Sequence, residues 1–104
     1  MQLFDPLLNN NTRYVIVAHL ARNGGKASFG DTLAAMTLPH SGMLSQHARK
    51  LETAGYLSIK KSFKNNRRPH TELVLTDAGR RALADHMAVL AAVADSSMME
   101  EAAS

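Results

Sequence analysis

Residues 41–55 read SGMLSQHARKLETAG, and this stretch decides the fold. Leu44, Ala48 and Leu51 recur at i, i+4 and i+7, a spacing that places them on one buried side of a helix. We expect Ser41 to cap its first turn, because a serine hydroxyl accepts from the free backbone N–H groups there. Gly55 stands where a left-handed residue ends a helix. The sequence therefore predicts a helix from about Ser41 to residue 54.

The side of this helix opposite the apolar stripe has an unusual composition. A merely solvated surface, which is the alternative interpretation, would more often carry Glu/Lys pairs. Here small and amide residues precede cations, an order suited to contacting base edges and phosphates. We predict that Gln46 pairs with adenine and that Arg49 pairs with guanine or a phosphate. The other DNA contacts predicted from this helix are Ser41, Gly42, Met43, Ser45 and Lys50.

The charge of the chain is distributed unevenly along its 104 residues, a length that predicts one domain. The net charge is +3, but residues 49–81 hold nine cations against three acids, a local charge of +6, whereas residues 82–104 hold four acids and no Lys or Arg. A basic middle and an acidic end indicate one surface that faces a polyanion.

Several classes of protein are excluded or disfavoured. Because there is no cysteine, a disulfide framework and thiolate chemistry are excluded. The five histidines are scattered without i, i+4 pairs, so we predict no metal site, and Ser, His and Asp are not grouped with an oxyanion-forming loop, so we predict no catalytic site and no cofactor. No apolar run approaches about 20 residues and the N-terminus lacks a signal-peptide pattern, which predicts a soluble, cytoplasmic protein.

Two helices are expected before residue 41. Residues 12–22 predict a helix that is apolar on more than one side, capped by Asn11 or Thr12, and such a helix is buried by more than one neighbour. A second helix is predicted to start at Ser28 with a capping box, to run through Met36 and to stop before Pro39. With the turn at residues 37–40 and the helix that follows, this makes a helix-turn-helix pattern.

A basic hairpin is expected after residue 55. Alternating apolar residues from Leu57 to Phe63 and the segment His70–Leu75 predict two strands, joined by a loop at residues 64–69. Such a hairpin forms a wing, and we expect Arg67 or Arg68 at its tip to enter the minor groove. The DNA contacts predicted from the wing are Lys60, Lys61, Lys64, Asn65, Asn66, Arg67 and Arg68.

The last helix is predicted to be capped by Thr76, to run from Asp77 to about Ala94, and to carry a long apolar stripe. We expect this stripe and the first helix to pair with a second copy, giving a C2 dimer that reads an inverted repeat. The predicted interface residues are Val15, His19, Leu83, Met87, Leu90 and Ala94. The predicted domain spans residues 1–95, and residues 96–104 are expected to form a flexible tail.

Two motifs carry a resemblance to a known family. Residues 44–57, LSQHARKLETAGYL, are similar to L-S-x-H-x-x-x-L-E-x-x-G-Y-[LV], and residues 73–80, LVLTDAGR, are similar to L-T-x-x-G-R. Over roughly residues 10–94 the chain resembles the small single-domain winged helix-turn-helix transcriptional regulators of the MarR/ArsR type. The resemblance implies a mainly α fold with a small β-hairpin, of the α+β class, with N-terminal and long C-terminal helices.

The resemblance implies sequence-specific binding of double-stranded operator DNA. The chain departs from metal-sensing ArsR proteins in having neither cysteine nor an evident His/Asp pair on the last helix. The sequence does not identify a small-molecule effector. Two alternatives stay open, namely a winged helix that binds another protein and one that binds RNA.

Overall fold

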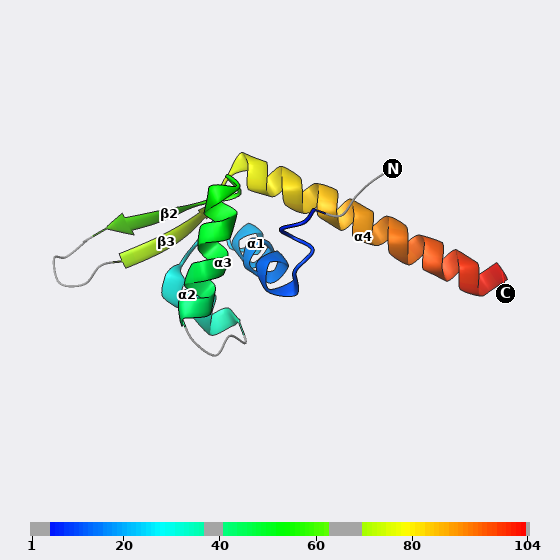
Figure 1. Cartoon of the computed structure of the whole chain (residues 1–104), viewed down its shortest axis with the longest axis horizontal. Coiled ribbons are helices and arrows are strands. Elements are labelled where there is room, and N and C mark those ends of the chain that lie inside the picture. The colour runs from blue at the N-terminus through cyan, green and yellow to red at the C-terminus, as the bar shows by residue number, and fades with distance from the viewer. Residues whose placement is uncertain (1–4, 37–40, 63–69, 104) are drawn as a thin grey trace.

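The part of the chain that the structure describes forms four helices and a small antiparallel sheet. In a computed structural model, residues 5–36, 41–62 and 70–103 are described, with side chains as far as residue 96. The elements, shown in Figure 1, are α1 (Asn11–Arg22), β1 (Lys26–Ser28), α2 (Phe29–Ala35), α3 (Ser41–Thr53), β2 (Leu57–Ser62), β3 (His70–Leu75) and α4 (Asp77–Ala103). The mainly α class with a β-hairpin and a long C-terminal helix is confirmed.

The sheet has one strand more than the sequence predicted. Its order is β1-β3-β2 with both pairings antiparallel, so β3 is central and β1 covers the edge that a two-stranded hairpin would leave free. Lys26 pairs with Val74, and the Leu75 N–H donates to the Gly25 carbonyl at 2.7 Å. Three residues are too few to show an alternating pattern, so β1 gives no strand signal of its own. Only its pairing with β3 identifies β1 as a strand.

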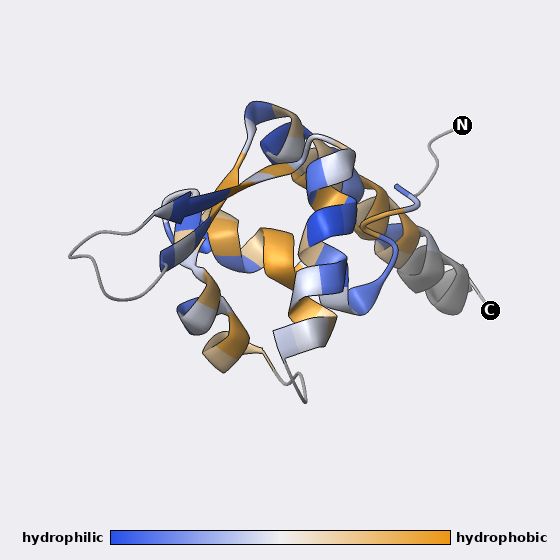
Figure 2. Cartoon of the chain, turned by 60° about the vertical axis from the view of Figure 1, so that its left-hand side comes forward, coloured by the Kyte–Doolittle hydropathy of each residue, from blue (hydrophilic) through white to orange (hydrophobic). Residues whose placement is uncertain are grey.

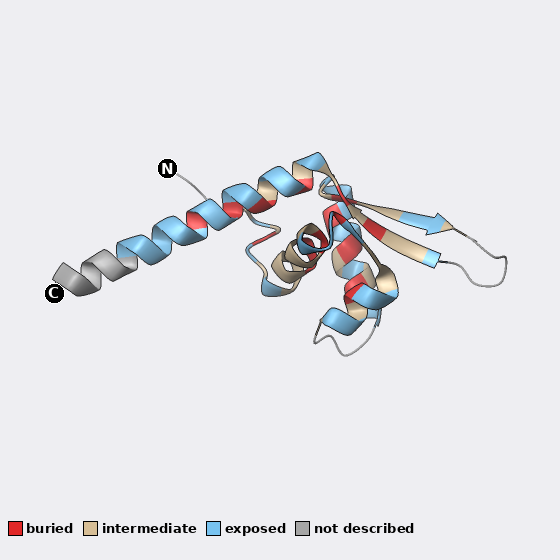
Figure 3. Cartoon of the chain, turned by 180° about the vertical axis from the view of Figure 1, so that it is seen from behind, coloured by how far each residue is buried: buried red, intermediate tan, exposed pale blue. Residues whose placement is uncertain are grey.

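The core lies where α1, α3, the sheet and the first turns of α4 meet. Figure 3 shows the buried positions concentrated there, and Figure 2 shows hydrophobic segments of α1 and the sheet gathered in the interior. The predicted stripe of α3 is confirmed, since Leu44, Ala48 and Leu51 are all at most 1% exposed. The other fully buried apolar residues are Leu8, Ile16, Val17, Leu20, Leu57 and Leu73.

Some helix boundaries differ from the prediction by one or two residues. The cap of α1 is Asn10, whose side chain accepts from the Arg13 N–H at 3.1 Å, rather than Asn11 or Thr12. Ser28 caps α2 as predicted, accepting from the Asp31 N–H at 3.0 Å, but the helix ends at Ala35. Ser41 is the first residue of α3 rather than the residue before it. The turn predicted at residues 37–40 lies outside the described residues.

Helix α4 extends beyond the body of the molecule. The predicted end near Ala94 is wrong, because the helix continues to Ala103. Residues 95–103 contain no Gly or Pro, and Met, Glu and Ala are good helix formers, so nothing local ends the helix. The radius of gyration is 16.2 Å and the long dimension 63 Å, whereas a compact chain of this length has a radius near about 13 Å. Figure 1 shows the far half of α4 standing clear of the other elements. None of the described helices combines the length and hydropathy needed to cross a bilayer.

Candidate nucleic-acid interface

The predicted outward face of α3 exists as one surface. Gln46, Arg49 and Lys50 are exposed, as are Ser41 and Gly42 at the start of the helix. Ser45 and Met43 are half-buried, so these two lie at the edge of the face. The stripe that includes Leu44 faces the core, so the polar face is turned to solvent. Five of the seven residues that the sequence assigned to α3 are therefore exposed, and the other two are partly covered.

The two lysines of β2 do not share a face. Lys60 pairs with Glu72 and Lys61 with Thr71, and consecutive strand residues point to opposite sides of a sheet. Lys61 lines the cleft beside α3, whereas Lys60 does not. The sequence analysis assigned both lysines to the DNA contacts of the wing, but only Lys61 is on the side that faces α3. The remaining predicted wing residues, Lys64, Asn65, Asn66, Arg67 and Arg68, lie outside the described residues.

A cleft of about 570 Å³ separates α3 from the wing hairpin of β2 and β3. Its rim holds the cations of Arg49 and Lys61, and its floor includes Ala48 and Leu73. Thr71 and Glu52 also line it, and the sequence analysis missed both. A hydroxyl and two cations across one cleft can bind a phosphate strand. Thr71 could have been found only from the β2–β3 register, which residues 64–69 do not reveal.

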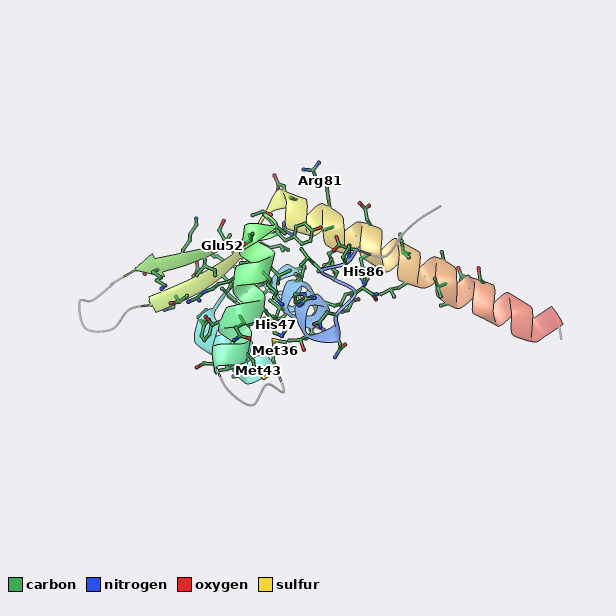
Figure 4. All side chains as sticks on the ribbon, viewed as in Figure 1. Met36, Met43, His47, Glu52, Arg81 and His86 are labelled. Atoms are coloured by element: carbon green, nitrogen blue, oxygen red, sulfur yellow. The ribbon has the colours of Figure 1, made fainter. Side chains whose placement is uncertain are left out.

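His47 fastens α3 to α1. Its Nδ1 lies 3.3 Å from Nη1 of Arg13, and because a guanidinium only donates, the imidazole must accept and is neutral. Figure 4 shows His47 on the side of α3 that faces α1. Burial lowers the pKa of His47, and the neighbouring charges of Arg13 and Lys50 lower it further. His47 is therefore a structural hydrogen-bonding residue.

Acidification is expected to loosen this contact. The pKa of His47 is below its unfolded value of 6.5, so the folded state binds fewer protons there than the unfolded state. The stabilisation is therefore complete above about pH 6.5 and is lost as the pH falls from there through the folded pKa. We expect His47→Gln to remove this part of the pH dependence, measured as urea unfolding of both proteins between pH 7.5 and 4.5. Parallel stability curves for the two proteins would contradict the assignment.

The segment before α1 is tied to the link that follows α3. The Asp5 carboxylate accepts from the Leu7 and Leu8 N–H groups at 2.8 and 3.2 Å and from the Tyr56 hydroxyl. Burial raises the pKa of Asp5, but these hydrogen bonds outweigh it and the pKa is lowered. The bond to Asp5 raises the pKa of Tyr56 to about 12. Arg13 Nε donates to the Leu7 carbonyl at 2.8 Å, which joins this segment to the His47 contact.

The predicted dimer residues fall into two groups. Leu83 is buried in the core of its own chain, and Val15 and His19 are half-buried on α1. Met87 and Leu90 are 50% and 39% exposed, Val93 is 48% exposed, and Ala94 is exposed too. A groove of about 460 Å³ runs between α1 and α4 and is lined by Val15 and Met87 among others. Within the described residues, no cluster of three His, Asp or Glu side chains is placed to hold a metal ion.

Comparison with known proteins is consistent across sequence and structure. Residues 12–94 match the sequence model of a family described as the winged helix DNA-binding domain. A transcriptional regulator homologue from Pyrococcus horikoshii OT3 is 30% identical, with a TM-score of 0.79 and 86% of each chain covered. No curated protein matches at a significant level.

Two more distant structures share the fold. A protein of Enterococcus faecalis V583 assigned to the MarR family of transcriptional regulators is 20% identical, with a TM-score of 0.70, over 94% of this chain and 84% of that one. PadR of Bacillus subtilis, solved in complex with operator DNA, is 19% identical, with a TM-score of 0.61, over 89% of this chain and 63% of that one. At these identities the likeness concerns the arrangement of the elements.

Proposed function

Because the chain belongs to the family of winged helix DNA-binding domains and is a DNA-binding regulator of transcription, we propose that α3 enters the major groove while the wing lies on the adjacent backbone. The observation that supports this arrangement is the cleft between Arg49 and Lys61. It has cations on both sides, and the exposed face of α3 continues from its rim. A phosphate strand in the cleft would separate the groove read by α3 from the groove reached by the wing.

Base recognition is assigned to the exposed side chains of α3. Gln46 can pair bidentately with adenine, and Arg49 can pair with guanine or with the phosphate in the cleft. Ser41, Ser45 and Lys50 can contact phosphates or base edges. Gly42 leaves room for the DNA backbone to approach the N-terminus of α3, where the helix dipole is positive. The tip residues Arg67 and Arg68 would enter the minor groove.

We further propose that the regulator is a homodimer in the cytoplasm and occupies an inverted repeat without catalysing a reaction. The stripe of α4 begins on its own body with Leu83 and continues past it, where Leu90 and Val93 are exposed. At 100° per residue both lie on the same side of the helix as buried His86 and Val89. An apolar stripe that extends beyond the rest of its chain is suited to packing against a second copy. Such a dimer would set two α3 helices about one turn of DNA apart.

Changing Gln46 and changing Lys61 should have different effects on binding. Gln46→Ala should alter the preferred sequence, whereas Lys61→Ala should weaken binding to all duplexes by about ten-fold and lower the salt slope by about 1. Titrations of operator and random duplexes between 50 and 300 mM salt measure both quantities. With about six phosphate contacts, wild-type affinity should fall roughly as the fifth power of salt.

The matched control for Lys61 is Lys26→Ala. Lys26 is also an exposed lysine on the sheet, but it belongs to β1 at the edge away from α3. It should leave affinity and slope nearly unchanged. If neither Gln46→Ala nor Lys61→Ala affected binding to duplex DNA, a protein-binding role would replace the proposal. Tighter binding to single-stranded RNA than to duplex DNA would favour the RNA-binding alternative.

A further inference from the structure

An acidic side chain lines the candidate DNA surface. Glu52 belongs to the last turn of α3 and lines the same cleft as Arg49 and Lys61. A carboxylate there repels phosphate, so electrostatics alone would disfavour it. Its contact gives it another role, because Glu52 Oε2 accepts from the backbone N–H of Ile59 at 2.9 Å. Figure 4 labels Glu52 at the end of α3 that adjoins β2.

Glu52 accepts its hydrogen bond at the outer edge of β2. Among the described residues, the order β1-β3-β2 leaves β2 with one strand neighbour. In an antiparallel ladder the N–H groups of alternate residues point away from the partner strand, and Ile59 is such a residue because its N–H reaches Glu52. Glu52 therefore joins the helix that faces the major groove to the middle of the strand that carries Lys61.

The connection between these two elements is short, and the Gly55 and Tyr56 N–H groups hold it by donating to the Glu52 and Leu51 carbonyls at 2.9 Å each. Residues 54–56 link α3 to β2, and Gly55 has a φ of +83°, a conformation that glycine adopts without strain. These bonds hold the start of β2, but a small tilt of the hairpin beyond it would move Lys61 relative to Arg49 and change the width of the cleft. The hydrogen bond from the Ile59 N–H to the Glu52 side chain restrains that tilt.

We propose that Glu52 is a positioning residue for DNA binding, which holds the wing at the angle where α3 and the wing contact the same duplex. The proposal rests on the proposed function and adds a determinant of affinity that touches no DNA. Its cost is one negative charge in a cationic cleft, and its gain is a wing whose position is set before DNA arrives.

The decisive comparison is between Glu52→Gln and Glu52→Ala. Both variants remove the charge, so both gain equally from reduced repulsion, but only the glutamine amide oxygen can still accept from the Ile59 N–H. We expect Glu52→Gln to bind operator duplex at least as tightly as wild type, and Glu52→Ala to bind at least three-fold more weakly than Glu52→Gln. Amide hydrogen exchange at Ile59 should be slow in wild type and Glu52→Gln and faster in Glu52→Ala.

A third variant tests the proposal even if Glu52→Ala folds poorly. Glu52→Asp keeps the charge but shortens the side chain by one methylene, so it should bind operator at least three-fold more weakly than wild type. If wild type binds duplex but operator affinity differs by less than three-fold both between Glu52→Ala and Glu52→Gln and between Glu52→Asp and wild type, the positioning role of Glu52 is overturned. The proposed DNA contacts would then still stand. Failure of wild type itself to bind any duplex would overturn the proposed DNA contacts instead, and the exchange rates at Ile59 would still report whether the tether exists.

Discussion

Leu90→Glu is expected to turn the proposed homodimer into monomers and to lower affinity for an inverted-repeat operator by about 100-fold or more. Leu90 is 39% exposed although it continues the buried stripe of α4. In a dimer it would be covered by the second copy, and burying an unpaired carboxylate there is strongly unfavourable. A monomer contacts one half-site only and loses the gain from simultaneous binding of two. Analytical ultracentrifugation and operator titration measure the two effects.

The matched control is Ala88→Glu. Ala88 is exposed on the same helix, but at 100° per residue it lies on the side opposite the stripe. Both variants add one negative charge to α4, so any general repulsion from DNA is equal. We expect Ala88→Glu to remain dimeric with nearly unchanged affinity. Equal sedimentation of wild type and Leu90→Glu at micromolar concentration would show that α4 does not form the dimer interface.

Gly79→Ala is expected to lower the free energy of unfolding by about 3 kcal/mol. Gly79 is buried in the first turn of α4, where an added Cβ would lie 2.7 Å from Leu75 Cδ1 and 2.9 Å from the Tyr56 carbonyl carbon, closer still to its oxygen. That carbonyl already accepts from the Thr76 N–H at 3.1 Å, so it cannot move without losing a bond. The melting temperature should fall by more than about 12 °C.

The same substitution at Gly30 should have the opposite sign. Gly30 lies in α2 with nothing near the position of an added Cβ, and alanine favours a helix over glycine. We expect Gly30→Ala to stabilise the protein by about 0.5–1 kcal/mol. Thermal unfolding followed by circular dichroism compares the two. A Gly79→Ala protein as stable as wild type would show that α4 can move away from Tyr56.

Periodic features of the chain were predictable, and features set by distant partners were not. The stripe of Leu44, Ala48 and Leu51 predicts which side of α3 is buried because a helix repeats within a few residues. Strand β1 has no such repeat, and its identity depends on Val74, which lies 48 residues from its partner Lys26. The end of α4 was also missed, because only the absence of Gly and Pro marks its continuation.

The candidate site shows the same division. The exposed face of α3 follows from helical spacing, so Gln46 and Arg49 were identified correctly as outward residues. The separation of Lys60 from Lys61 and the role of Glu52 depend on the β2–β3 register and on how α3 meets β2. Those contacts join residues that no local pattern relates.

The pairing of β1 with β3 has a consequence for the order of folding. The β2–β3 hairpin closes a short loop, whereas β1 must find β3 across 48 positions, so its entropic cost is larger and its formation later. Since β1 leads directly into α2 and α2 also packs on β3, part of what holds the helix-turn-helix in place is missing until β3 is present. We therefore expect that a nascent chain does not bind duplex DNA before residue 75 has emerged, and that residues 29–53 excised alone do not form a DNA-binding unit.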